Sequence, residues 1–542
     1  MSGSSPETPE TPVLIVGAGP VGLGFAADLG WRGIDCTLVE QGAGTIDHPR
    51  ANIVNARTME FCRRWGVAEK VRAAGLPPDF PHTILHVTSL AGYELSRLEP
   101  ADHGGSGASP ASPERQQRCN QMSFDPVIRG LAESFPTVRL IFGRRLTGFH
   151  QDANGVTADI EDTGAGTMSR IRAQWMIDCS GGASRIREAL GIGLEGNNVL
   201  GRSVNIFFHS AELARVHDKG PAAMYMITGP KGVWANVVAV DGRDYWRATI
   251  QGVGAEVELT PERIQAWLDE TIGVRFAYET RAAVRWTRRT VVSEQFRAGR
   301  VFLAGDSAHQ LSPSGGFGMN TGMGDVDNLG WKLAAVLRGW GGPNLLDSYR
   351  AERRPVAVRN VTEAAGAFHG RNFTASPAIL ENTAEGAALR RETGRRIDEV
   401  VAASFRADGV VFDYRYQPSA VVMPDGTPEP PYTMTEYHPS GWPGARAPHG
   451  WLPDGRSTLD LFGHGFVLLK FDGAPDAAPL VDAAKDRGVP LAIYEIANGE
   501  IAALYGRRLA LVRPDGHVAW RGDTLPADPL LLIDTVRGAA AG

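Results

Sequence analysis

One stretch near the N-terminus constrains the fold of this chain more than any other. An apolar run from Val13 leads into Gly17-Ala-Gly-Pro-Val-Gly22 and an apolar helix, and a second strand ends in Glu40, about 20 residues on. Gly17 suits a tight turn, Gly19 lets the backbone approach a pyrophosphate, and Gly22 lets the helix pack on the strand. Glu40 is placed to bond ribose hydroxyls. The pattern predicts a dinucleotide-binding βαβ unit, and the acid favours an unphosphorylated ribose.

A second glycine-rich segment lies far along the chain, over residues 301–320. It begins as an apolar strand, passes through a loop with Gly315, Gly316 and Gly318, and continues as a helix. These glycines leave backbone N–H groups open to a ligand, and the helix N-terminus adds partial positive charge. Asp306, at the strand end, is placed to accept hydrogen bonds from sugar-like hydroxyls. The alternative is an ordinary strand–loop–helix connection with Asp306 as a helix cap.

The composition is that of a soluble globular protein. The chain has 542 residues, of which 43% are hydrophobic and 21% charged, enough for about two to four domains. A net charge of −6 argues against a nucleic-acid partner. No apolar run reaches the length of a membrane span, and residues 1–12 form a polar tail without a secretory signal, which we expect to be disordered. We therefore expect a cytoplasmic protein with no membrane partner.

The cysteines and histidines indicate neither a disulfide framework nor a metal site. The four cysteines, the last of which is Cys179, have no paired spacing, so we expect reduced thiols. His82 and His86 are four residues apart, but the alternation around them is typical of a strand. We expect no bound metal.

Several motifs together resemble the single-component (class A) FAD-dependent aromatic hydroxylases. The shared motifs are Gly17 to Glu40, Gly305-Asp306, Pro313 with Gly316-Phe-Gly-Met-Asn320, and Tyr349-Arg-Ala-Glu-Arg-Arg-Pro355. Similarity to the phenol and chlorophenol hydroxylase branch, which includes arylpropionate and polyketide hydroxylases, is carried by His48-Pro-Arg-Ala-Asn52, Trp442-Pro-Gly-Ala-Arg-Ala-Pro-His449 and Leu511-Val-Arg-Pro-Asp-Gly-His517. The resemblance covers nearly the whole chain.

The resemblance implies an α/β fold: a Rossmann-like FAD-binding domain of the p-hydroxybenzoate hydroxylase type, an inserted antiparallel β-sheet substrate domain and a C-terminal thioredoxin-like domain. The expected ranges are 13–80, 114–200 and 290–370 for the FAD-binding domain, 81–113 and 201–289 for the substrate domain, 371–449 for helices and a linker, and 450–542 for the thioredoxin-like domain. No cysteine follows Cys179, so the last domain has no thiol redox role. We expect it to brace the FAD domain or a homodimer.

Hydrophobic periodicity predicts individual elements. We predict helices over residues 58–65, 125–133, 261–270, 356–368 and 384–405, and strands over 205–209, 224–228, 233–240 and 245–251. In the C-terminal part, we predict strands over 466–471, 491–495, 509–512 and 517–520, and helices over 479–486 and 530–538.

The resemblance implies FAD as the bound cofactor and NADPH or NADH as a transient reductant. The residues expected to contact FAD are Gly17, Gly19, Pro20, Gly22, Glu40, Gln41, Arg50, Gln121, Ser180, Asp306, Pro313, Gly316, Gly318, Met319 and Asn320. Ser180-Gly181 stands where the family usually has an Asp-Gly pair. Ser180 keeps a hydroxyl but lacks the charge that helps the reductant approach. Asp178 could substitute, although two residues along a strand it shares a face with Ser180 without occupying its position.

Three residues are expected near the chemistry: Asn52, Pro313 and Arg57. Relatives can carry Asp or His at the position of Asn52, where it takes a phenol proton, whereas an amide can orient a hydroxyl without accepting its proton. A phenol costs about 4 kcal/mol to ionise at neutral pH. We therefore expect an already acidified substrate or a proton path through water and Tyr or His. For Arg57, the alternative is solvent exposure or support of a helix.

An aromatic pocket is expected on the inserted sheet and the nearby loop. Its candidate residues are Tyr225, Trp234, Tyr245, Trp246, Arg247, Leu311 and Ser314. Alternation along strands places about half of such side chains in the core instead.

These expectations combine into a FAD-dependent monooxygenase that uses NAD(P)H and O2 to hydroxylate a small phenolic or other electron-rich aromatic ring, ortho or para, through a flavin hydroperoxide. The alternative is a flavoprotein reductase or a Baeyer–Villiger-type monooxygenase of the same fold, acting on a polyketide-like substrate. A third interpretation, favoured only by Ser180, is a catalytically silent flavin-binding scaffold. The sequence does not identify the substrate.

Overall fold

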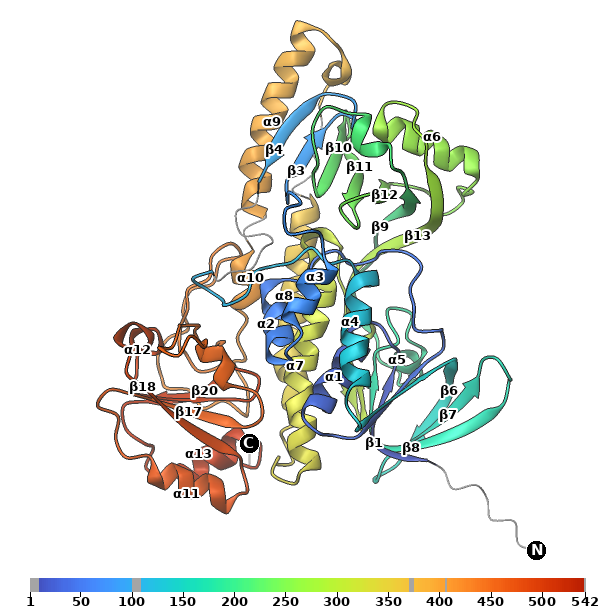
Figure 1. The fold of residues 1–542 in the computed structure, drawn as a ribbon. Helices are drawn as coiled ribbons and strands as arrows, with labels where there is room; N and C mark the ends of the chain where they lie inside the picture. The colour runs from blue at the N-terminus through green and yellow to red at the C-terminus, as the bar shows by residue number, and fades with distance from the viewer. Residues whose placement is uncertain (1–8, 100–108, 370–374, 405–406, 541–542) are drawn as a thin grey trace, which may run out of the picture.

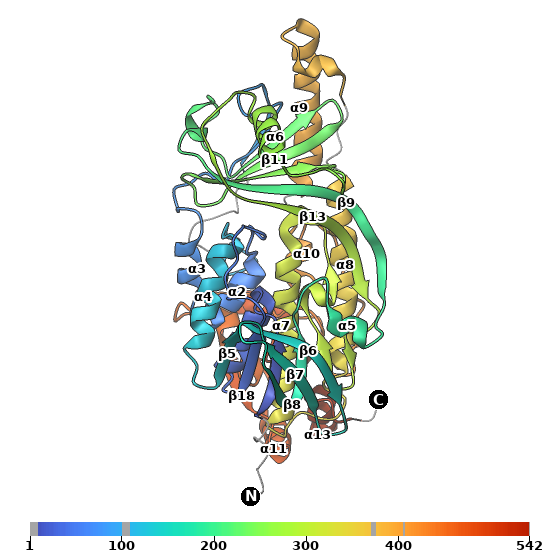
Figure 2. The ribbon, with the colours of Figure 1, turned by 90° about the vertical axis from the view of Figure 1, so that its right-hand side faces the viewer.

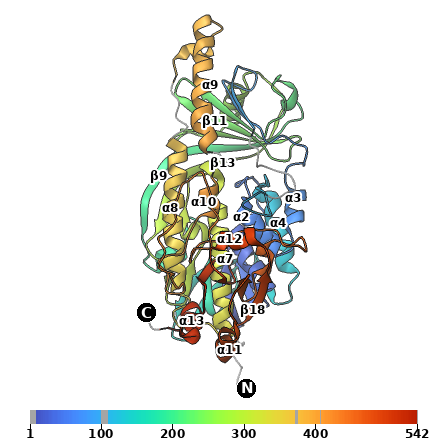
Figure 3. The ribbon, with the colours of Figure 1, turned by 90° about the vertical axis from the view of Figure 1, so that its left-hand side faces the viewer.

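The structure has three bodies grouped around one long helix (Figure 1). A computed structural model of the chain describes residues 9–99, 109–369, 375–404 and 407–540. We call the bodies the basal sheet with its helices, the upper sheet, and the C-terminal module, residues 440–540. Figure 3, which views the molecule from the side of the C-terminal module, shows this module beside the central helix and well below the upper sheet.

The basal sheet carries the dinucleotide-binding pattern. Its strands are β1 Glu10–Val16, β2 Cys36–Glu40, β5 Val138–Phe142, β6 Arg144–Gln151, β7 Val156–Asp162, β8 Met168–Asp178, β14 Arg297–Ala298 and β15 Val301–Leu303. Their order is β14-β15-β8-β1-β2-β5, and the β6–β7 hairpin pairs with the first half of β8. The pairs from β15 to β5 are parallel. Since β1 begins at Glu10, residues 10–12 are strand, and the prediction of a tail to residue 12 is wrong there; residues 1–8 lie outside the described residues.

Helices pack on both faces of this sheet. They are α1 Pro20–Trp31, α2 Ala56–Arg64, α3 Ala68–Ala74, α4 Gln121–Glu133, α5 Arg185–Ala189, α7 Phe317–Leu337 and α8 Ser348–His369. All but α5 pack on one face, while α5 and the β6–β7 hairpin cover the other, so both faces are buried as a parallel sheet requires. The central helix is α7, whose residues are buried along most of its length. It packs against α1, where an added Cβ on Gly24 would lie 3.1 Å from the sulfur of Met323.

The upper sheet is formed by eight strands in the order β16-β13-β9-β12-β11-β10-β3-β4. They are β3 Ile84–Val87, β4 Glu94–Leu98, β9 Leu194–His209, β10 Met224–Gly229, β11 Gly232–Ala239, β12 Tyr245–Gln251, β13 Glu279–Ser293 and β16 His309–Gln310. All pairs are antiparallel except β10 with β3. Helix α6, Pro261–Ile272, packs its apolar side on one face, which leaves the other face toward the basal sheet.

One strand of the upper sheet is longer than predicted, and its partner strand was not predicted. Strand β9 spans 16 residues, of which only the last five were predicted, and its partner β13 spans 15 residues. Figure 2 shows both strands curving down past α8 to the level of α5. The extra length is rich in polar residues because it crosses between two bodies rather than lying in one core.

The C-terminal module contains a four-stranded mixed sheet with helices. The strands, in the order β18-β17-β19-β20, are β17 Phe466–Phe471, β18 Leu491–Ile496, β19 Leu509–Val512 and β20 Val518–Gly522; the helices are α11 Ala478–Asp486, α12 Gly499–Tyr505 and α13 Pro529–Val536. In the sequence, α9 Ala384–Ser404 and α10 Asp408–Phe412 come between the upper sheet and the module. Helix α9 packs along β4, beside the upper sheet (Figure 1). The short 3-10 turns are η1 Leu213–Arg215, η2 Gly305–Ser307, η3 Ser314–Gly316, η4 Pro377–Leu380 and η5 Thr458–Leu461. The predicted α/β class is confirmed.

Two helices begin earlier than predicted. Helix α4 begins at Gln121 and α8 at Ser348, so Pro126 and Pro355 both lie inside helices. An interior proline costs about 3 kcal/mol because it removes a hydrogen bond and clashes with the preceding turn. In α8, contacts with other elements offset this cost: the Tyr349 hydroxyl, for example, donates to a carbonyl of β15 at 2.9 Å.

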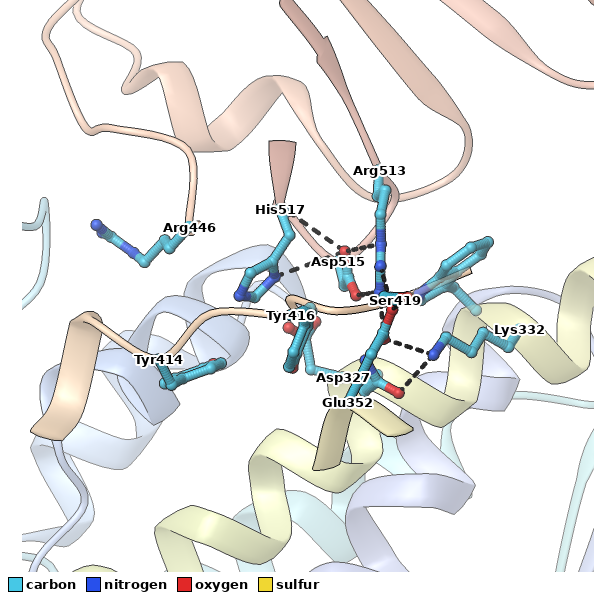
Figure 4. A network of polar contacts seen from close by, with 12 residues as sticks. Asp327, Lys332, Glu352, Tyr414, Tyr416, Ser419, Arg446, Arg513, Asp515 and His517 are labelled. Carbon is cyan, nitrogen blue, oxygen red and sulfur yellow. Dashed lines mark hydrogen bonds and ion pairs between the residues drawn. The ribbon is translucent and has the colours of Figure 1, made fainter. Parts of the chain in front are cut away.

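The C-terminal module is joined to α7 and α8 by buried ion pairs (Figure 4). The Glu352 carboxylate accepts hydrogen bonds from Arg513 at 2.6 and 2.8 Å and from Lys332 at 2.6 Å. Ser419 also donates to it, at 2.6 Å. Burial opposes ionisation, yet Arg513 and Lys332 together lower the pKa of Glu352 to about 2. The module is therefore an integral part of the folded molecule.

Candidate functional site

A cavity of about 1270 Å³ lies between the basal sheet and the upper sheet. It is bordered by the carboxyl ends of β1, β2, β8 and β15 and by the free face of the upper sheet. Ligands of open α/β sheets bind at such carboxyl ends. Small-molecule cavities usually measure about 300–1,000 Å³, so this cavity has room for a cofactor and a second ligand.

The first glycine motif closes one end of the cavity. Gly17 has a φ of 105°, and an added Cβ there would lie 2.4 Å from the carbonyl oxygen of Cys179. A Cβ on Gly22 would lie 1.9 Å from the Gly17 carbonyl, whereas one on Gly19 would meet nothing within 4 Å. Gly17 and Gly19 line the cavity, while Gly22 lies behind it. The turn thus presents open backbone to a ligand.

Glu40 fixes the same turn. Its carboxylate accepts hydrogen bonds from the backbone N–H of Ala18 at 2.8 Å and of Gly42 at 2.7 Å. Each oxygen retains a further lone pair, because a carboxylate offers about four acceptor sites. Pro20 and Gln41 line the cavity on either side. The predicted adenosine-binding residues are therefore together, apart from Gly22.

Asp306 borders the cavity from η2, directly after β15. Its side chain is exposed to the cavity, yet protein surrounds it closely enough that desolvation raises the pKa of the carboxyl. The turn is fixed from behind by Asp325 of α7, whose Oδ2 accepts from the Gly305 N–H at 3.0 Å and lies 2.7 Å from His309 Nε2. The Asp306 carboxyl group is therefore available to bind a ligand in the cavity.

The second glycine motif forms another wall. Pro313, Gly316, Gly318 and Met319 line the cavity, and Gly316 has a φ of 71° at the N-terminus of α7. A Cβ on Gly318 would meet nothing within 4 Å. Backbone N–H groups at this helix start are oriented to bind an electron-rich ring edge.

Asn320 is placed behind this wall instead of in it. Its amide donates to the carbonyls of Ile53 at 3.0 Å and Gly316 at 2.7 Å, and it accepts from the Asn55 N–H at 3.0 Å. Asn320 does not line the cavity. The prediction of direct cofactor contact is thus replaced by a positioning role, in which Asn320 ties together two loops that do line it.

The loop of residues 49–55 carries Asn52 into the cavity. The Ala51 carbonyl accepts from the Gln121 N–H at 3.0 Å, and Val54 forms a β-bridge with Gln117. The Asn52 amide nitrogen is buried and has no hydrogen-bond partner. A buried donor without a partner is costly, which fits a site whose partner is a bound ligand.

The first turn of α4 adds an acid that the sequence analysis did not identify. The Gln121 amide donates to Asp125 Oδ2 at 2.9 Å, while Asp125 Oδ1 is buried without a partner. Burial raises the pKa of Asp125 to about 7. Arg50 is close enough to act on it electrostatically, and all three residues line the cavity. The spacing of four residues from Gln121 on one helix was the available signal.

Ser180 lines the cavity, whereas Asp178 does not. The Ser180 hydroxyl and N–H donate to Asp178 Oδ1 at 2.6 and 2.9 Å, and the Ser184 hydroxyl donates to Oδ2 at 2.5 Å. Asp178 is fully buried, and burial raises its pKa. Asp178 thus anchors the turn from beneath and does not present its charge to the cavity.

The upper sheet contributes a different set of residues from the one predicted. Arg247 and Leu311 line the cavity as predicted. Other lining residues of the sheet are Ser203, Asn205, Met224, Met226, Asn236, Thr249, Gln251 and Trp286. The Asn236 oxygen and the Trp286 indole nitrogen are buried without partners. This wall is mixed polar and apolar, not predominantly aromatic.

The predicted aromatic lining is wrong for four residues. Tyr225, Trp234 and Trp246 belong to or pack against the core between the sheet and α6, and the Trp246 indole donates to a backbone carbonyl at 3.3 Å. Tyr245 packs against other rings and does not line the cavity. Side chains alternate along a strand, so Met224 and Met226 beside Tyr225, and Arg247 beside Trp246, line the cavity instead. The side chain of Ser314 lies outside the described residues.

Arg57 is also placed away from the cavity, which removes support for its predicted catalytic role. It is buried, and its guanidinium donates to Glu60 at 2.7 Å, Asp327 at 3.1 Å and the Tyr414 hydroxyl at 3.0 Å. Arg446 of the C-terminal module binds the same Glu60 carboxylate. The alternative of structural support is the one the geometry favours, in a buried ion cluster rather than at the surface.

Two arginines of the cavity wall have no anionic partner. Arg118 is 2% exposed, and its three guanidinium nitrogens have no hydrogen-bond partner. Arg247 donates to the carbonyls of Pro49 and Arg50 at 3.3 and 2.9 Å, and its Nε has no partner. Burial lowers the pKa of both Arg118 and Arg247 to about 10, which still leaves them protonated at neutral pH. Sequence analysis could not single out Arg118, because its lack of a carboxylate partner depends on how distant segments pack in the fold.

Two classes of feature have no candidate within the part of the chain that the structure describes. No group of three potential metal ligands is found there. No described helix combines the length and the apolar character needed to cross a membrane.

Two family models match this chain. The FAD binding domain model matches residues 10–364, and the model of the C-terminal domain of aromatic-ring hydroxylases matches residues 440–537. The chain is 34% identical to tetracenomycin B2 monooxygenase-dioxygenase of Streptomyces olivaceus, over 97% of this chain and 98% of that protein. It is 32% identical to 2,4-dichlorophenol 6-monooxygenase of Delftia acidovorans, over 94% of this chain and 95% of that protein.

A solved structure of RebC with bound 7-carboxy-K252c has the same fold. The TM-score is 0.91 and the identity 39%, with 98% of this chain and 100% of RebC covered.

Proposed function

This chain belongs to the FAD-dependent aromatic-ring hydroxylases, and we propose that its substrate is a polycyclic aromatic compound with an ionised oxygen. The predicted activity, a FAD-dependent monooxygenase of aromatic rings with NAD(P)H as reductant, is confirmed at the level of the family. The substrate proposal rests on one observation: the cavity wall holds two guanidinium groups, those of Arg118 and Arg247, that have no carboxylate partner, in a space larger than one ligand needs.

The residues of the cavity fit FAD. Gly17, Gly19 and Glu40 would hold the adenosine end, Asp306 and Gln121 the ribityl chain, and the loop of Pro313 to Met319 the ring. Bound FAD supplies the redox chemistry by which electrons from NAD(P)H activate O2. The predicted use of O2 is part of this proposal.

The chain's own residues favour an anionic substrate. Asn52 can orient a ring hydroxyl but cannot take its proton. Arg118 and Arg247, in contrast, supply positive charge in a buried setting, where opposite charges attract more strongly than in water. A nearby cation lowers the pKa of a phenol and thereby reduces the cost of ionisation, about 4 kcal/mol at neutral pH. A base at position 52 is then unnecessary.

The relatives support a substrate of this class. One acts on tetracenomycin B2, and RebC binds 7-carboxy-K252c, whose name indicates a carboxyl group. The 2,4-dichlorophenol monooxygenase acts on a smaller phenol acidified by chlorine. The names of two of these compounds thus indicate an acidic group, a carboxyl or a chlorinated phenol.

Binding of three naphthalene derivatives to the holoenzyme tests the proposal. We expect 3-hydroxy-2-naphthoate, a carboxylate, or 2,4-dinitro-1-naphtholate, a phenolate, to bind about 10- to 100-fold more tightly than neutral 2-naphthol, because charged hydrogen bonds contribute about 1.5–3 kcal/mol. In Arg118→Met this preference should shrink while 2-naphthol binding stays unchanged. Equal affinities for all three ligands in the wild type would contradict the proposal.

Turnover separates the reaction classes. We expect ring compounds that bind to stimulate NAD(P)H oxidation and to gain one oxygen as a ring hydroxyl. A lactone product would instead indicate Baeyer–Villiger chemistry, and reduction without oxygen incorporation would indicate a reductase. Flavin that is never reduced would indicate a silent scaffold.

We further propose, as expected from the sequence, a cytoplasmic enzyme and a homodimer. Three of the four cysteines are buried and none is paired, which suits a reducing compartment. Light scattering of the purified holoenzyme gives the oligomeric state directly, and a monomeric mass at micromolar concentration would contradict the dimer.

A further inference from the structure

Asp325 is the residue that sets the position of the turn bearing Asp306. Its side chain is fully buried, and one oxygen accepts from the Gly305 N–H at 3.0 Å and lies 2.7 Å from His309 Nε2. Its other oxygen accepts from Arg353 Nε at 2.9 Å. Since Gly305 precedes Asp306 directly, a shift of the Asp325 carboxylate would move the backbone that carries Asp306.

Arg353 links Asp325 to the chain segment that leads into the C-terminal module. Its guanidinium donates to the Tyr416 hydroxyl at 3.3 Å and to the Thr321 carbonyl at 2.8 Å. The guanidinium is tightly enclosed, because a Cβ on Gly324 would lie 2.6 Å from Arg353 Nη2. Arg353 can therefore not move far without moving Asp325.

Tyr416 in turn packs against the C-terminal module (Figure 4). Its ring centroid lies 4.2 Å from that of His517. His517 belongs to the turn that begins at Arg513, which is fixed by Glu352 at 2.6 Å. His517 also lies 3.6 Å from Asp515 of the same turn. A continuous series of buried contacts thus leads from this turn to the cavity.

We propose that the C-terminal module positions Asp306 through Tyr416, Arg353 and Asp325, so that these are positioning residues for cofactor binding. The inference rests on the proposed role of Asp306 in holding FAD. It assigns the module a part in cofactor binding, beyond bracing the fold.

A matched pair of variants tests this series of contacts. Tyr414 and Tyr416 are neighbouring buried tyrosines with ring centroids 5.8 Å apart, and each hydroxyl accepts a hydrogen bond from a buried arginine. The Tyr414 hydroxyl binds Arg57, whereas the Tyr416 hydroxyl binds Arg353. The Tyr414 ring also lies 5.4 Å from the Arg353 guanidinium, but a phenylalanine keeps that ring contact. Tyr414→Phe and Tyr416→Phe therefore remove equivalent groups with different connections.

We expect Tyr416→Phe to raise the dissociation constant of FAD about 3- to 10-fold, the range of one buried hydrogen bond, and Tyr414→Phe to change it less than about twofold. FAD dissociation from the purified holoenzyme is followed by recovery of flavin fluorescence, and the melting temperature of each variant is recorded. The two variants should lose similar thermal stability, because each leaves one arginine N–H without an acceptor.

A second variant protects the test against misfolding. Arg353→Lys keeps a cation beside Asp325 but loses the fork that reaches Tyr416, so we expect weaker FAD binding in this variant and no further weakening when Tyr416→Phe is added. Equal FAD affinity in Tyr414→Phe and Tyr416→Phe, or additive effects in the double variant, would overturn the inference. Wild-type protein that binds no FAD would instead contradict the proposed function.

Discussion

Buried arginines occur in two regions of this molecule, the contact with the C-terminal module and the cavity wall, and their surroundings differ. In the first region, Arg57, Arg446 and Arg513 each bind a buried carboxylate at hydrogen-bond distance. In the second, Arg118 and Arg247 have no carboxylate close enough to affect their charge. Both regions contain guanidinium groups, but only in the first does each of these groups bind a carboxylate.

The difference shows how structural and ligand-binding charges can be told apart. Burying an ion costs several kcal/mol, which a carboxylate partner largely offsets. A buried cation without a partner keeps that cost in the folded protein, so its retention points to a partner that comes from outside the chain. The contact with the module is thus complete by itself, while the cavity wall is complete only with ligands.

The largest expected effect is on stability, and it tests the comparison directly. We expect Arg513→Met to lower the free energy of unfolding by about 3–5 kcal/mol, because it removes the arginine from buried Asp515 and leaves buried Glu352 with Lys332 as its remaining cation. Arg118→Met, the same substitution in the cavity wall, should lower it by less than about 1 kcal/mol or raise it. Denaturant unfolding of both variants measures the difference. Equal losses of unfolding free energy in the two variants would contradict the proposed difference in charge compensation between the two regions.

A second prediction concerns the carboxylates of the same two regions. Glu352 is ionised well below neutral pH, whereas burial raises the pKa of Asp125 to about 7. Between about pH 4 and 7 the unfolded state ionises at Asp125 while the folded state keeps its proton, so this group reduces stability as pH rises. Asp125→Asn should remove a decline on the order of 4 kcal/mol. The measurement is unfolding at a series of pH values.

The control for that series is Glu352→Gln. The folded pKa of Glu352 is depressed, so its stabilising contribution is present above about pH 4 and lost as pH falls toward 2. The two variants should therefore change the pH profile in opposite directions. If the stability of the wild type and of Asp125→Asn changed with pH in parallel, the Asp125 carboxylate would already be compensated by charges in the folded protein.

The smallest expected effect lies at Ser180, which is paired inside the protein although it borders the cavity. Ser180→Asp places a second carboxylate beside buried Asp178, whose oxygen is 2.6 Å from the Ser180 hydroxyl. Like charges repel, so the new side chain should turn into the cavity. We expect an unchanged FAD content and a change of less than about tenfold in the rate of flavin reduction by NADH or NADPH. Ser180→Asn controls for size, and stopped-flow absorbance measures the rate.

The sequence predicted the parts of the site that depend on local structure. Gly17 and Glu40 lie within one βαβ unit, and Asp306 lies three residues after the end of its strand, so spacing alone placed them correctly at the cavity. The residues of the upper sheet that face the cavity were harder to predict. Alternation gives the period of a strand but not which face is inward, so Tyr225 was chosen where its neighbours Met224 and Met226 line the cavity.

The arginines show the limit more clearly. Arg57 binds Asp327, which is 270 residues away in sequence, and Arg118 has no such partner. Nothing adjacent to either residue distinguishes them, because pairing over such separations is decided by how the three bodies pack. The same holds for Asp125, whose raised pKa reflects burial by distant elements.

The paired strands β9 and β13 restrict how the enzyme can open. They stay hydrogen-bonded from Ser293 with Leu194 to Glu279 with His209, and Val292 also pairs with His309, three residues after Asp306. A hinge motion between the upper sheet and the basal sheet would have to break hydrogen bonds between β9 and β13. Passage of substrate and product must therefore rely on local movements at the rim of the cavity, while the upper sheet stays fixed.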